Sequence, residues 1–90
     1  MSNDVNKIIV WTNPTAPFQK VYVMKEGVLI DQLGVKVEDV EDVVFALMDK
    51  HGITQIDFSG AVAFAEHFGK NIQETNVTKY GARDLTINYL

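Results

Sequence analysis

The chain contains 90 residues, which is enough for a single domain with one hydrophobic core and too few for a second. Hydrophobic residues make up 47% of the sequence and charged residues 22%, a balance typical of folded globular proteins and unlike that of disordered chains. The net charge is -4, and the eight Lys and Arg residues are spaced singly along the chain, so we expect no nucleic-acid partner.

The sequence contains no cysteine, which excludes disulfides, thiolate zinc sites and a thiol nucleophile. Because small secreted domains usually carry disulfides, we expect a cytoplasmic location. The chain starts with the polar stretch MSNDVNK, and the apolar run that follows it, IIVW, has only four residues. We therefore expect neither a signal peptide nor a membrane-spanning segment, and no membrane partner.

The first predicted element is a strand over residues 7–12, KIIVWT. Its residues are β-branched and aromatic, and it ends at Asn13-Pro14, a turn signal. A continuous apolar run of this kind predicts a central strand that is buried on both faces.

Two further β-like runs, at 19–25 and 28–35, follow the PTAP segment. Between them lies Glu26-Gly27, where the glycine supplies the positive φ that a tight hairpin with a bulge requires. We expect these two runs to pair antiparallel.

The hydrophobic period then changes to that of an amphipathic helix over residues 37–52. Its first turns are acidic, and Lys50 and His51 precede Gly52, which suits the helix dipole and a left-handed C-terminal cap. The apolar face consists of Val40, Val43, Val44, Leu47 and Met48.

The pattern over the rest of the chain predicts a strand at 54–59, a second helix directly after it, and β-like runs at 76–80 and 85–90. Residues 81–84 separate these last two runs as either a turn or a bulge. The end of the chain therefore forms either a hairpin or one interrupted edge strand. The apolar residues that recur at helical spacing in the second helix are Ala61, Phe64, Ala65, Phe68 and Ile72.

These elements predict one α/β domain over residues 1–90, in the order β-β-β-α-β-α-β with an extra C-terminal strand as an option. A right-handed helical crossover should return the fourth strand beside the first and parallel to it. The expected sheet is mixed and ordered 3-2-1-4-5. An apolar strand ending in a polar turn (IIVWTNPT), a hairpin with Lys-Glu-Gly at its tip and a following α-β-α-β together resemble the ribonuclease H-like superfamily, which includes the N-terminal lobe of actin-like proteins.

The resemblance implies acidic residues that hold metal ions, beginning with an aspartate on the first strand. In this chain Thr12 stands at that place. Asp57 on the fourth strand and Glu41 or Asp42 on the first helix could stand for the other acids. Neither histidine has a partner at metal-ligand spacing. We therefore expect no catalytic residues, no metal site and no cofactor, and whether the chain is an enzyme stays open, with the balance against it.

The Ser59-Gly60 step has two readings. Actin-like proteins bind phosphate with glycine-rich turns and helix N-termini, and a Ser-Gly before a helix could do the same. Serine before a helix is also a common N-terminal cap, which is the preferred reading. If a ligand site exists, we expect it where the first and fourth strands end at the second helix. Its candidate residues are Thr12, Asn13, Thr15, Asp57, Ser59 and Gly60.

The preferred function is a small non-catalytic protein-interaction or regulatory module, similar in size and type to accessory proteins of bacteriophages and mobile elements. Tyrosines near the strands and the uncharged C-terminal run LTINYL would favour association if exposed. We expect a protein partner or self-association, such as a homodimer. The alternative is a small domain that binds an anionic ligand, a nucleotide or phosphate, with a weakly catalytic role as the last option.

Overall fold

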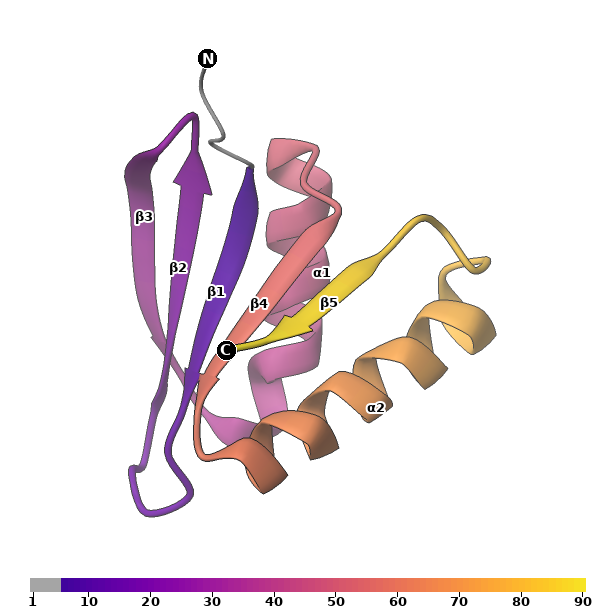
Figure 1. The fold of residues 1–90 in the computed structure, drawn as a ribbon. Coiled ribbons are helices and arrows are strands. Elements are labelled where there is room, and N and C mark those ends of the chain that lie inside the picture. The colour runs from indigo at the N-terminus through magenta and orange to yellow at the C-terminus, as the bar shows by residue number, and fades with distance from the viewer. Residues whose placement is uncertain (1–5) are drawn as a thin grey trace.

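The structure, a computed structural model, describes residues 6–90, so the prediction made for the polar start of the chain falls partly outside the described residues. Within this range, five strands and two α-helices follow one another in the predicted order β-β-β-α-β-α-β, and a short 3-10 turn precedes the first helix (Figure 1). The elements are β1 Lys7–Thr12, β2 Gln19–Lys25, β3 Val28–Val35, η1 Val37–Asp39, α1 Val40–His51, β4 Gln55–Gly60, α2 Val62–Lys79 and β5 Thr86–Tyr89.

The strands form one mixed sheet in the order β3-β2-β1-β4-β5, visible from left to right in Figure 1. β2 is antiparallel to β1 and β3, whereas β4 is parallel to β1 and β5. This confirms the predicted fold class and strand order. Both crossovers, through α1 and through α2, step across the sheet in the same direction, and right-handed crossovers of that kind place both helices on one face.

The hydrophobic core lies between that face and the two helices. Strand residues that share the face, such as Ile8, Val10 and Phe58, are fully buried and belong to one cluster with Val44 and Phe68 of the helices. In the part of the chain that the structure describes, no helix covers the other side, which we call the uncovered face.

The prediction that β1 is buried on both faces is therefore wrong. Its alternate residues Lys7 and Ile9 are only half-buried, and Trp11 is 40% exposed. The side chains of this apolar run therefore lie in two environments: one set is buried in the core, and the other set is apolar but partly exposed to solvent. A run without alternation does not distinguish these from a strand between two helical layers.

The β2–β3 hairpin matches its prediction closely. Glu26 and Gly27 both have positive φ, 54° and 76°, and the register of the two strands shifts between Val23 and Met24. The antiparallel pairing and the bulge are thus confirmed, and β3 becomes the outer strand on one side of the sheet.

The predicted β-like run at 76–80 is wrong, because α2 continues to Lys79. The helical face that contains Ile72 extends to Asn76, whose side-chain amide donates to the carbonyl oxygen of Arg83 at 2.8 Å. Tyr80 then stacks on Phe45 of α1 with ring centroids 4.1 Å apart. Packing of this helix end onto α1 overrides the β propensity of the local sequence.

The C-terminal run is neither a hairpin nor an interrupted strand, since only Thr86–Tyr89 form a strand and this strand lies at the sheet edge. Tyr89 stacks on Phe58 at 5.9 Å, and its hydroxyl lies against Gly69 of α2, where a Cβ would overlap it. The small residue lets α2 approach β5 closely.

Candidate functional site

Thr12 and the end of β4 are joined by side-chain and backbone hydrogen bonds at the place where the resemblance puts a catalytic aspartate. The Thr12 side chain is buried, and its hydroxyl donates to the carbonyl oxygen of Ser59 at 2.8 Å. The Thr12 carbonyl oxygen in turn accepts from the backbone N–H of Ala61 at 3.2 Å. Thr12 therefore links the ends of two parallel strands to the start of α2.

Gly60 is required by this contact. Its φ is 101°, and a Cβ on it would overlap the carbonyl oxygen of Thr12. Only glycine combines this backbone conformation with so close an approach of two backbone segments.

The preferred reading of Ser59 as a helix cap is wrong. Ser59 is still part of β4, opposite Trp11 of β1, and the N-terminal cap position of α2 belongs to Ala61. No side chain donates or accepts a cap hydrogen bond there. The strand continues for two residues more than a cap at Ser59 would allow, because Ser59 and Gly60 pair with β1.

Asn13 and Thr15 organise the turn between β1 and β2. The Asn13 Oδ1 atom accepts from the backbone N–H and the hydroxyl of Thr15, at 3.1 and 2.9 Å. Gln19, which is fully buried, accepts from the backbone N–H of Asn13 through Oε1 and donates to the Asn13 carbonyl oxygen through Nε2. Sequence reasoning missed Gln19, because a polar residue at a strand start gives no sign of burial.

Asp57 lies on the uncovered face, where it pairs in register with Ile9 and Asn88. Its carboxylate is almost fully buried and accepts from Gln55 Nε2 and Asn88 Nδ2, each at 3.0 Å, while Lys7 Nζ lies 3.2 Å away. Burial raises the pKa of this carboxyl, but the hydrogen bonds from Gln55 and Asn88 and the ion pair with Lys7 outweigh it. The net pKa of Asp57 is lower than its ordinary value.

The six candidate residues therefore do not form one site. Thr12 and Gly60 lie together under the helices, Asn13 and Thr15 lie in the turn, and Asp57 and Ser59 belong to the opposite face of the sheet. Over residues 6–90, no group of three or more His, Asp or Glu side chains is arranged to hold a metal ion. The same residues contain no helix long and apolar enough to span a membrane.

A different surface stands out at the β3 edge, by which we mean the outer side of Val28–Val35. Three consecutive apolar residues are exposed there: Val28 by 58%, Leu29 by 47% and Ile30 by 45%. Beside the other end of the strand lies a groove of about 470 Å³ between β3 and the start of α1, which we call the β3–α1 groove. It is lined by Phe18, Leu33, Gly34, Val35, Lys36, Asp39, Asp42 and Val43.

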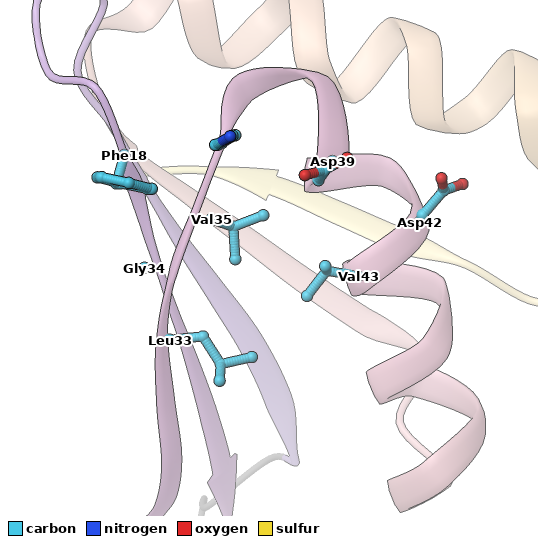
Figure 2. Close-up of a pocket in the computed structure, with 8 residues that line it drawn as sticks. Phe18, Leu33, Gly34, Val35, Asp39, Asp42 and Val43 are labelled. Atoms are coloured by element: carbon cyan, nitrogen blue, oxygen red, sulfur yellow. The ribbon is translucent and has the colours of Figure 1, made fainter.

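Figure 2 shows the side chains of Leu33, Val35 and Val43 pointing into this space, with Asp39 and Asp42 above them at the start of the helix. The groove is thus apolar at its base and acidic at its rim. Its residues come from the end of the β1–β2 turn, from β3, from the segment through η1 that follows it and from α1, so no sequence motif could have identified it.

Comparison with known proteins identifies no relative of this chain. The chain matches no family model, and neither the curated proteins nor the solved structures include a significant match.

Proposed function

We propose that this chain is a small non-catalytic protein-interaction module that associates through the β3 edge of its sheet. The observation that carries the proposal is the run of exposed apolar residues Val28, Leu29 and Ile30 on an eight-residue edge strand. An edge strand leaves alternate backbone N–H and C=O groups unpaired, and these pair readily with another extended segment.

Natural proteins usually protect such edges with lysine, proline, very short strands, bulges or inward-pointing charges. β3 contains neither lysine nor proline, and its bulge and its one charged residue, Asp31, leave the stretch Gln32–Val35 beside the groove without any of these devices. The opposite edge strand, β5, is only four residues long. The contrast supports β3 as the interaction edge.

The internal use of the candidate polar groups supports the non-catalytic part of the proposal. The Thr12 hydroxyl, the Asn13 amide oxygen and the Asp57 carboxylate each already accept or donate hydrogen bonds within the chain. A ligand would have to compete with these bonds. The anion-binding alternative gains no specific support from the geometry.

The proposal includes the ribonuclease H-like resemblance at the level of fold, which the strand order supports. It also retains a cytoplasmic location, in keeping with the absence of cysteine, and a role as an accessory protein of a bacteriophage or mobile element.

The test compares two variants that add the same charge at exposed apolar residues. Ile30→Lys places a lysine on the β3 edge, whereas Val77→Lys places one on α2, where Val77 is 65% exposed. Sedimentation over a concentration series and affinity capture from a cell extract would measure association. We expect association to be lost in Ile30→Lys and retained in Val77→Lys. An association that neither variant weakens, or its complete absence in the unmodified protein, would refute the proposal.

A further inference from the structure

We infer that the partner of the β3 edge is an extended segment of another protein that carries a lysine or arginine. The segment pairs with β3, places apolar side chains in the β3–α1 groove and sets its basic residue against Asp39 and Asp42. This inference rests on the proposed function and specifies its partner.

Hollows lie on both faces of the sheet along the β3 edge. The β3–α1 groove lies on the helix side, next to Leu33 and Val35. A smaller hollow of about 140 Å³ lies at the same edge and is lined by Lys20, Tyr22, Gln32, Leu33 and Gly34. Of these, Lys20 and Gly34 pair in register, as do Tyr22 and Gln32, and both pairs belong to the uncovered face.

An added strand fits this arrangement because its side chains alternate between the two faces of the sheet. A strand beside β3 would direct every second side chain toward the groove and the others toward the smaller hollow. Backbone pairing supplies affinity in this mode of recognition, and pockets for alternate side chains supply specificity. A compact ligand, in contrast, would occupy only one of the hollows and would leave the backbone groups of the edge strand unpaired.

The base of the β3–α1 groove is apolar. Leu33, Val35 and Val43 form its base, and the ring of Phe18, which is half-exposed, forms one side. Burial of an aliphatic side chain among these residues removes apolar surface from water on both partners. We therefore expect valine, isoleucine or leucine at the groove positions of the segment.

The rim of the groove carries an excess of negative charge. Asp39 and Asp42 are exposed at the start of α1, and Glu38 and Glu41 are their neighbours in the first turns. One cation, Lys36, lines the groove beside two carboxylates. A second copy of this chain has the same net charge of -4, so charge complementarity favours a basic partner over self-pairing at this place.

The experiment uses two synthetic octapeptides with blocked ends. One alternates valine and threonine and carries a lysine at each end, and the other has glutamate in place of both lysines. Each is titrated into the full-length isotope-labelled protein, and amide shifts are recorded by NMR. We expect the lysine peptide to shift amides of Val28–Val35 and of Asp39–Val43, and to bind about fivefold more tightly than the glutamate peptide.

A matched pair of variants isolates the rim. Asp39→Asn combined with Asp42→Asn should reduce the affinity for the lysine peptide about fivefold, because two exposed ion pairs are removed. Glu66→Gln combined with Glu74→Gln removes the same charge from exposed positions of α2 and should leave the affinity unchanged. Raising the salt concentration should weaken binding of the lysine peptide and make its affinity more similar to that of the glutamate peptide.

The outcomes separate this inference from the proposed function. Equal binding of both peptides along β3 would overturn the role of the acidic rim while edge pairing stands. Shifts confined to the uncovered face around Trp11, or no binding of either peptide, would overturn the inference as a whole. Self-association at neutral pH that Ile30→Lys abolishes would also overturn it, because a second copy would then occupy the edge despite its net charge of -4, although the proposed function would remain.

Discussion

The contact between Gly60 and Thr12 gives the sharpest prediction for a single residue. Gly60→Ala should destabilise the protein by about 2 kcal/mol or more, because the new Cβ meets the Thr12 carbonyl oxygen and the backbone at φ 101° is strained. The control is Gly52→Ala at the end of α1, where φ is 66° and nothing lies within 4 Å of the added Cβ. That variant should cost only about 1 kcal/mol. Urea denaturation measures both, and equal losses would contradict a specific role for the contact.

Asp57 gives a prediction about pH. Its pKa in the folded protein is lower than the ordinary value of 3.8, so the folded state holds the carboxylate more favourably than the unfolded chain does. The resulting stability is present above pH 3.8 and is lost as the pH falls through the folded-state pKa. Asp57→Asn should therefore reduce the free energy of unfolding at pH 7 and should make it fall less on acidification.

The measurement is thermal or urea denaturation of both proteins over a series of acidic pH values, with the carboxyl carbon shift of Asp57 as a direct titration. Parallel pH profiles for the two proteins would show that the network of Gln55, Asn88 and Lys7 does not stabilise the charged form.

At the scale of whole elements, a substitution in α2 tests whether its C-terminal end is helical or extended. Val77 is exposed in the last turns of the helix. In a helix, Val77→Ala should stabilise the protein by about 0.5 kcal/mol, because alanine has the higher helix propensity. In a strand the same change would destabilise it. Chemical denaturation decides between the two, and loss of stability would contradict the helical assignment.

Sequence patterns predicted some elements of this fold correctly and failed at the end of α2. The hairpin at Glu26-Gly27 and the amphipathic α1 were predicted because their signals are local: a turn dipeptide and a helical period. Strand order followed from the handedness of crossovers. The run at 76–80 was misassigned because Val77 and Thr78 have β propensity, whereas its helical state depends on Tyr80 packing on Phe45, which lies far away in the sequence.

The prediction that the six candidate residues form one ligand site failed for a related reason. Thr12 and Asp57 both lie on neighbouring strands, yet register places Thr12 beside Gly60 and Asp57 beside Ile9, on opposite faces. A one-residue difference in register exchanges the faces, and sequence alone does not fix it at this level. The β3–α1 groove depends equally on tertiary structure, since Phe18 and Val43 come to line the same space only after the sheet and α1 have packed together.

For the whole molecule, the acidic charge and the apolar β3 edge act against each other. At neutral pH the net charge of -4 keeps copies of the chain apart, and this repulsion vanishes near the isoelectric point of about 4.9. There the exposed Val28, Leu29 and Ile30 should promote association of folded molecules, because pH 4.9 is still above the range in which Asp57 is protonated. Light scattering should therefore rise as the pH approaches 4.9, while circular dichroism stays unchanged.

Ile30→Lys and Val77→Lys again separate the effect of the β3 edge from that of net charge, since each variant adds one positive charge and shifts the isoelectric point equally. If the edge drives association, Ile30→Lys should suppress scattering at its own isoelectric point and Val77→Lys should not. If both variants scatter as the unmodified protein does, loss of net charge alone accounts for the association. The comparison thus measures how far one apolar edge strand, in a chain of 90 residues, determines the behaviour of the molecule in solution.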